Sequence, residues 1–176
     1  MDYPGDPVDV VDAIRTRRTH KAFGAEPVPR ETVAELLELG RFAPNHHLTQ
    51  PWRFRVLGPE TLARLAATGK EGELEKLRRA PTLVVASAKL TGDPWQDAED
   101  LHATACAVYA VLLGAHARGL ASYWRTPKVL QGPAGQAVVG FDPDERFVGL
   151  IHLGPRVDDP PAKERLPLGE VARFLP

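Results

Sequence analysis

Residues 95–119 read WQDAEDLHATACAVYAVLLGAHARG and form the longest helix that the sequence predicts. Acidic residues occupy its first turn, where we expect Asp97, Glu99 and Asp100 to be solvated and to favour the helix dipole. The second half is apolar on most sides, which is typical of a helix in the middle of a protein. Gly119 is the expected end of the helix, because glycine readily adopts the left-handed conformation found there.

Segments of strand character lie on both sides of this helix. TLVVASAKL (82–90) is almost continuously apolar, as expected of a buried central strand. An alternating pattern indicates a strand over 52–57, and shorter strands are expected at 121–127 and 146–154. About four strands are too few for a full doubly wound sheet. We therefore predict an α+β fold, a three-layer sandwich whose central antiparallel or mixed sheet is flanked by helices.

Helical periodicity recurs in the rest of the chain. Thr32 and Glu35 have the spacing of a capping box near the start of one such segment. Residues 1–7 are expected to form an arm, and residues 8–176 a single domain. The further predicted helices are 8–18, 30–42, 59–68, 72–80, 128–140 with a break near Gly132 and Pro133, and a short one at the end of the proline-rich tail 155–176.

Composition excludes several classes of protein. Twenty-two basic and 23 acidic residues give a net charge of −1, so the chain lacks the basic excess of a general nucleic-acid binder. No apolar run approaches the roughly 20 residues of a membrane span, and no secretory signal is visible. Cys106 is the single cysteine, so no intrachain disulfide forms, and a cytoplasmic protein is expected. Its Ala, Val and Tyr neighbours predict a small buried side chain.

Three polar clusters are candidates for binding. Arg17, Arg18 and Thr19 follow the first helix and could grip a phosphate through bidentate and neutral donors. The alternative is that the two arginines cap the helix in water. His116, near the end of the helix at 95–119, is expected to be a helix-end cation.

The second cluster is APNHHLTQPW (43–52), where amide, imidazole and hydroxyl groups suit a flat heterocycle. Adjacent histidines could suggest zinc, but no Cys or carboxylate stands at ligand spacing, so no metal is expected. Trp52 is expected in the core. In the third cluster, Ser122 to Thr126, Arg125 should have an anionic or carbonyl partner, or form an ordinary salt bridge.

Four motifs in order resemble the nitroreductase family of FMN-dependent oxidoreductases. They are RTRRTHKAFG (15–24), then VPRETVAELLELGRFAPNHHLTQPWRFRVL (28–57), RGLASYWRTP (118–127) and FVGLIHLGPR (147–156). In detail the chain is similar to the short bacterial subgroup of NAD(P)H nitroreductases, which has A-P-D-H before Q-P-W and W-R-S after the central helix. The chain departs from the family at Leu48, Thr19 and Lys21, and it lacks the insertions that shape substrate pockets in larger members.

The resemblance implies an intertwined homodimer with two FMN sites at its interface. Asn45 and His46 then contribute from the second subunit, while Lys163 and Arg165 resemble the residues that hold the phosphate in longer members. The residues that match FMN contacts of the family are Arg17, Arg18, Thr19, Asn45, His46, Gln50, Trp124, Arg125, Thr126, Lys163 and Arg165.

The chemistry that the resemblance implies belongs to the cofactor, and no side chain is expected to act as acid or nucleophile. NAD(P)H would pass a hydride to flavin N5 in a ping-pong cycle, and a nitroaromatic, a quinone or another flavin would be reduced. Two alternatives are a flavin-binding protein without efficient turnover and a flavin-fragmenting or dehalogenating relative on the same fold.

Overall fold

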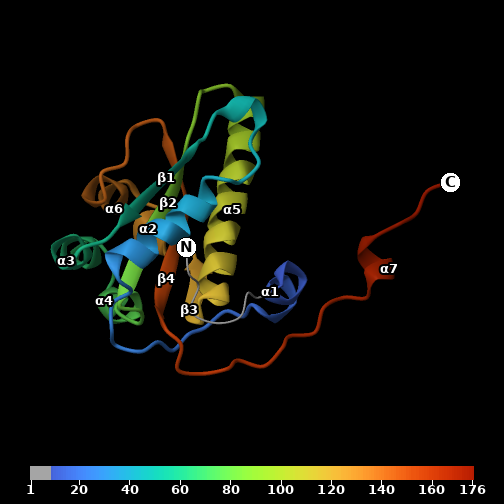
Figure 1. Cartoon of the computed structure of the whole chain (residues 1–176). Coiled ribbons are helices and arrows are strands. Elements are labelled where there is room, and N and C mark those ends of the chain that lie inside the picture. Colours follow the sequence, from blue (N-terminus) through green and yellow to red (C-terminus); the bar gives the residue numbers. More distant parts are fainter. Residues whose placement is uncertain (1–8) are drawn as a thin grey trace.

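A four-stranded antiparallel sheet forms the centre of the computed structural model, which describes residues 9–176 (Figure 1). The strands lie in the order β1-β2-β4-β3, and every neighbouring pair is antiparallel. The sheet is therefore antiparallel and not mixed. Its strands are β1 (Trp52–Val56), β2 (Thr82–Lys89), β3 (Leu120–Arg125) and β4 (Glu145–Pro155).

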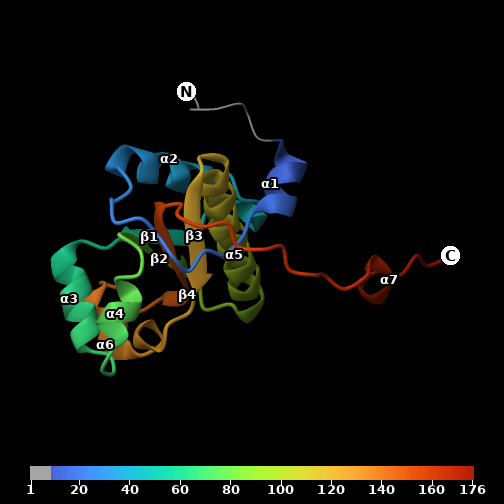
Figure 2. The same ribbon diagram turned by 90° about the horizontal axis from the view of Figure 1, so that it is seen from below.

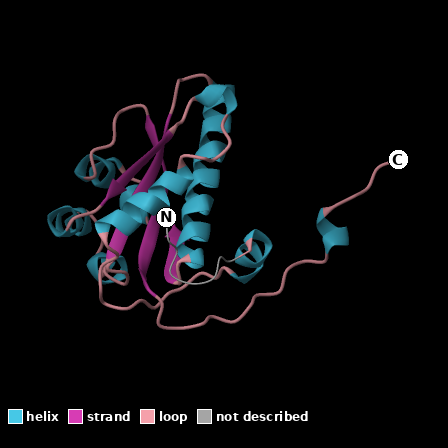
Figure 3. Ribbon diagram, viewed as in Figure 1, coloured by secondary structure: helices cyan, strands magenta, loops and turns pink. Residues whose placement is uncertain are grey.

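The helices agree with the predicted segments to within a few residues (Figure 3). The arm expected at residues 1–7 lies outside the described residues. Between residues 9 and 176, no helix is long and apolar enough to cross a membrane. The helices are α1 (Val10–Thr16), α2 (Arg30–Gly40), α3 (Pro59–Ala67), α4 (Glu73–Leu77), α5 (Pro94–Ala117), α6 (Pro133–Val138) and α7 (Leu168–Val171), with 3₁₀ turns η1 (His46–Leu48) and η2 (Lys128–Leu130).

Helices cover both faces of the sheet and make three layers (Figure 2). On β2, Val84 and Ala86 point into a core shared with α2 and α5. The alternate residues, Leu83 and Val85, point into a second core shared with α3, α4 and η2. This alternation is the period of a strand buried on both faces, as the sequence predicts.

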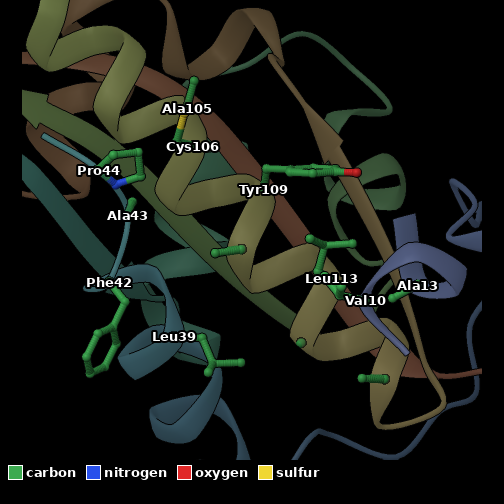
Figure 4. Close-up of a pocket in the computed structure, with 13 residues that line it drawn as sticks. Val10, Ala13, Leu39, Phe42, Ala43, Pro44, Ala105, Cys106, Tyr109 and Leu113 are labelled. Carbon is green, nitrogen blue, oxygen red and sulfur yellow. The ribbon is translucent and has the colours of Figure 1, made fainter. Parts of the chain in front are cut away.

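Helix α5 runs across the sheet with Val108, Val111 and Ala115 buried against it. Its opposite side forms an apolar groove of about 750 Å³ with α1 and the end of α2 (Figure 4). Cys106 lines this groove and is exposed, so the prediction that it is buried is wrong. The helix is apolar on most sides, but the sheet covers only one of these sides, and Cys106 lies on the side that faces the groove.

One prediction about the helix ends is confirmed and another is wrong. Gly119 follows α5 with φ +70°, as expected of a residue that closes a helix. The capping box predicted at Thr32 and Glu35 is absent: Pro29 is the N-cap of α2, so Thr32 lies inside the helix. The carboxylate of Glu35 instead accepts a hydrogen bond from Arg118 of α5 at 3.0 Å.

The chain after β4 runs away from the sheet and ends in the short α7 (Figures 1 and 2). The apolar side chains of this tail are exposed rather than packed in the core. They are Val157, Leu166, Leu168, Val171, Phe174 and Leu175.

Candidate functional site

Arg17 lies where α1 meets the C-terminal half of α5. Its backbone N–H closes α1 on Ala13, and its guanidinium carbon lies 6.0 Å from the centre of the Tyr109 ring. The Nε of Arg17 is buried and has no hydrogen-bond partner in the described part of the chain. A buried donor without an acceptor costs about 1–3 kcal/mol, and more when it is charged.

Other basic groups surround Arg17. His116 of α5 lies with its Nε2 2.8 Å from the Oγ1 of Thr16. Burial, and then the charges of Arg156, Arg17, His20 and Arg18, lower the pKa of His116 below its ordinary value of 6.5. His116 lies in the last turn of α5 as predicted, but its lowered pKa leaves the imidazole mainly neutral at pH 7, so it carries little of the expected positive charge.

Arg18 and Thr19 complete the first predicted cluster but point differently from Arg17. Arg18 is half-buried, and its Nη1 donates to the carbonyl oxygens of Arg15 at 2.6 Å and Arg17 at 3.0 Å. Thr19 is exposed. Positive charge therefore gathers on one surface beside α1, and such a surface favours an anion with several oxygens.

The loop around η1 holds the second predicted cluster in a strained conformation. Positive φ angles occur at three residues that are not glycine: His47 (54°), Leu48 (53°) and Gln50 (46°). Asn45 stabilises the loop, because its Oδ1 accepts a hydrogen bond from the Gln50 backbone at 2.9 Å and its Nδ2 donates to Ala43 at 3.1 Å. Strain of this kind persists only where surroundings impose it, and it concentrates at functional sites.

Two contacts attach this loop to the N-terminal half of α5. The Nδ1 of His46 donates to Glu99 at 2.8 Å, and Thr49 donates to Asp100 at 2.6 Å. Asp100 is 1% exposed, so the prediction that it is a solvated acid is wrong; its carboxylate anchors the loop. The rings of His46 and His47 stack with centroids 3.8 Å apart, and no three His, Cys, Asp or Glu side chains of residues 9–176 form a metal cluster.

The third predicted cluster lies at the end of β3 and divides between the two faces of the sheet. Trp124 packs against the α5 core and donates from Nε1 to Val148 at 3.3 Å. Any Cβ at Gly149 would overlap this indole, so the glycine makes room for it. Thr126 is exposed, and its carbonyl accepts a hydrogen bond from Gln131 at 2.9 Å.

Arg125 is half-buried on the other face, and within residues 9–176 its guanidinium makes neither a hydrogen bond nor an ion pair. The carbonyl or carboxylate partner expected for it is thus not supplied by the described chain. Nearby, His152 of β4 is 1% exposed and both of its ring nitrogens are unpartnered.

The sequence did not indicate the buried, unpartnered imidazole of His152, because only its register on β4 buries it. It lies opposite Leu83 and Tyr123, with ring centroids 5.8 Å from Tyr123 and 6.3 Å from Phe23. Burial, followed by the charges of Arg125 and Arg79, lowers its pKa to about 3. The imidazole is neutral at pH 7, so Arg125 carries the positive charge at this place.

The first and second predicted clusters of one chain do not come together. Thr16 and Arg17 adjoin His116 near one end of α5, whereas His46 and Thr49 bind Glu99 and Asp100 near the other (Figure 1). Asp100 and His116 are separated by about 24 Å along the helix. Lys163 and Arg165 lie in the exposed tail, where Arg165 donates to the Lys163 and Glu164 carbonyls.

The fold is that of nitroreductase-like α+β proteins. A solved nitroreductase-like protein from Bacillus cereus covers 97% of this chain and 98% of its own, with a TM-score of 0.88 and 23% identity. A solved structure from Desulfovibrio desulfuricans, titled as a "putative nitroreductase in complex with fmn", is 27% identical, covers 100% and 99% of the two chains, and has a TM-score of 0.78.

The sequence comparisons agree with the fold. The model of the nitroreductase family matches residues 14–68, which include the first two predicted clusters. The Bacillus subtilis protein named "Putative NAD(P)H nitroreductase YfhC" is 29% identical over 173 residues, covering 89% of each chain. A 5,6-dimethylbenzimidazole synthase from Rhodospirillum rubrum is 29% identical over 90% of this chain and 88% of its own. The chain is thus similar to proteins named as nitroreductases over most of its length, and it has their fold.

Proposed function

We propose that this protein is an FMN-dependent NAD(P)H oxidoreductase of the nitroreductase type that works as a homodimer. The buried, unpartnered Nε of Arg17 carries the proposal, because it lies in a basic surface that fits the phosphate of a nucleotide. The names of the B. subtilis and Escherichia coli relatives as NAD(P)H nitroreductases, and the FMN in the D. desulfuricans structure, support the choice of cofactor.

The residues present fit FMN at several points. Arg17 and Arg18 would bind the phosphate, and Thr19 would donate to the ribityl chain. Arg125, which lacks a partner in the described chain, would place positive charge near the pyrimidine edge and favour the reduced cofactor. Trp124 would contribute indirectly, because its packing against Gly149 fixes the backbone of the segment that carries Arg125. Bound FMN supplies hydride acceptance and donation at N5, so the chain needs no nucleophile of its own.

A second copy of the chain would complete the site. A partner that packs antiparallel against the groove along α5 brings its Asn45 and His46 toward Arg17, across the distance that separates them in one chain. The groove is lined mainly by apolar side chains, among them Leu39, Phe42 and Leu113 (Figure 4). Covering such a surface in a two-fold dimer is favourable.

The exposed tail fits the same arrangement. Its apolar side chains have no place in the core of their own chain, so they are available to cover a partner subunit. Packing of the tail would also set the positions of Lys163 and Arg165, which we propose to reach the phosphate only in the dimer.

In the completed site, NAD(P)H and an oxidised acceptor would occupy the same place in turn. The chain's part is to bind and orient these flat molecules, to exclude water, and to hold positive charge at Arg125. We propose nitroaromatics and quinones as acceptors and a cytoplasmic location for the reaction.

The first test is the visible absorption spectrum of purified protein before and after loading with FMN, followed by turnover with NADH and NADPH. We expect about one FMN per chain, bleaching by NAD(P)H, and full recovery when nitrobenzene or a quinone is added. Oxidation of NAD(P)H no faster than with free FMN would indicate a binding protein without turnover. Loss of flavin over repeated cycles would indicate a flavin-fragmenting enzyme.

A further inference from the structure

His116 joins the last turn of α5 to the last residue of α1. Its Nε2 lies 2.8 Å from the Oγ1 of Thr16, and the same Oγ1 lies 2.5 Å from the carbonyl oxygen of Asp12. A hydroxyl has one hydrogen and a carbonyl has none, so Thr16 donates to Asp12 and accepts from His116. The neutral imidazole therefore carries its hydrogen on Nε2, and Nδ1 is the ring nitrogen that can take a further proton.

The groups that face this imidazole are basic. They belong to the chain that follows α1 and to the start of the tail after β4, and they are Arg17, Arg18, His20 and Arg156. The acids of these segments have other partners: Asp158 lies 3.0 Å from the Nδ1 of His20, and Asp159 pairs with Arg156. No carboxylate of residues 9–176 forms an ion pair with His116, since the histidines that do so are His20 and His46.

A bound phosphate would reverse the charge around His116. In the described chain, burial and then these positive charges hold the pKa of His116 below its ordinary value. The Nε of Arg17, one residue after Thr16, is buried without a partner, and a phosphate that accepts from it would act on His116 with the opposite sign. An opposite charge within about 4–6 Å shifts a pKa by about 1–3 units toward the charged form. The phosphate and the proton therefore favour each other's binding.

We propose that His116 is a further phosphate-binding residue, whose Nδ1 takes up a proton from solvent when the phosphate of FMN binds beside Arg17 and keeps it while the phosphate is bound. The imidazole changes from neutral to a single positive charge, and its Nε2 keeps the hydrogen bond to Thr16. This inference rests on the proposed function, because it needs FMN at the basic surface. The contribution of His116 to FMN affinity is complete below the pKa of the FMN-free protein and is lost as pH rises through the pKa of the FMN-bound protein.

The first test measures the Kd of FMN for wild-type protein and for His116→Gln at pH 6 and at pH 8. The amide nitrogen of glutamine can keep the hydrogen bond to Thr16, but it does not titrate. The phosphate of FMN has a second pKa of about 6, and this titration is common to both proteins, so it cancels in the ratio of their Kd values. We expect the ratio of variant to wild type to be near 1 at pH 8 and about fivefold to tenfold at pH 6, because one pKa unit corresponds to tenfold in affinity.

The second test follows the imidazole itself by NMR in wild-type protein, with the spectrum of His116→Gln used to assign its signal. The pKa of His116 should rise by at least about one unit when FMN binds. Riboflavin, which has the ring system of FMN but no phosphate, should leave this pKa unchanged.

Several results would overturn the inference. They are a Kd ratio that is the same at both pH values, a pKa of His116 that FMN leaves unchanged, an equal rise with riboflavin, and a rise with inorganic phosphate but not with FMN. In each of these cases FMN still binds or is replaced by a free anion, so the two claims can be told apart. Wild-type protein that binds no FMN would overturn the proposed function and this inference together.

Discussion

Replacement of Arg17 by alanine should weaken binding of the cofactor while it changes the stability of the fold little. In the described chain the Nε of Arg17 is buried without a partner, so this N–H is desolvated without compensation. In the FMN-bound protein the same group would donate to phosphate oxygens. The residue is therefore expected to favour the bound state and to add little to the stability of the free chain.

The size of the effect follows from the number of bonds. A hydrogen bond to a charged group contributes about 1.5–3 kcal/mol, and two such bonds give at least about 3 kcal/mol. Loss of about 3 kcal/mol corresponds to an FMN Kd that rises about 100-fold. In the free protein, the alanine removes a cation–π contact of about 0.5–1 kcal/mol but also an unpaired buried donor. We expect the free energy of unfolding of FMN-free protein to fall by less than about 1 kcal/mol.

Arg15→Ala is the matched control. Arg15 is exposed at the same end of α1, and its loss changes the net charge by the same amount. Quenching of flavin fluorescence measures FMN binding, and urea unfolding of the FMN-free protein measures stability. If Arg17→Ala binds FMN as tightly as Arg15→Ala does, Arg17 does not hold the phosphate and the reasoning fails.

Two further predictions concern the groove and the buried histidine. Leu113→Glu places a charge in the groove and should give a monomer that retains little FMN, measured by sedimentation and absorbance; a flavin-loaded dimer would contradict this, and Val56→Glu is the exposed control. Burial lowers the pKa of His152 from 6.5 to about 3, so protonation favours the unfolded chain as pH falls below 6.5. From pH 7 to pH 5, protonation of His152 in the unfolded chain should lower the free energy of unfolding by about 2 kcal/mol. Urea unfolding of His152→Phe should show a fall that is smaller by this amount. Parallel curves for the variant and the wild-type protein would refute the prediction.

The secondary structure could be predicted from the sequence because the local patterns are strong. The apolar run of β2 and its alternation into two cores, the left-handed Gly119 and the helical periodicity of α5 all act within a few residues. Which side of α5 faces the sheet could not be predicted, because the helix is apolar on most sides. This ambiguity explains why Cys106 was expected inside and lies in the groove.

The sequence names candidate site residues but does not show how they are arranged. The clusters at Arg17 and Asn45 are visible as motifs, yet only the structure shows that they lie near opposite ends of α5. His152 gave no signal, because its burial depends on the register of β4 against β2 and β3. The strain at Gln50 also escaped prediction, since no glycine marks the positive φ.

The central claim is that two chains together complete each FMN site. Native mass spectrometry of the FMN-loaded protein tests it directly, because it reports the number of chains and of cofactors in the same particle. The account predicts two chains carrying two FMN molecules, with cofactor and dimer lost together in Leu113→Glu. A monomer that binds FMN as tightly as the wild-type protein does would contradict it.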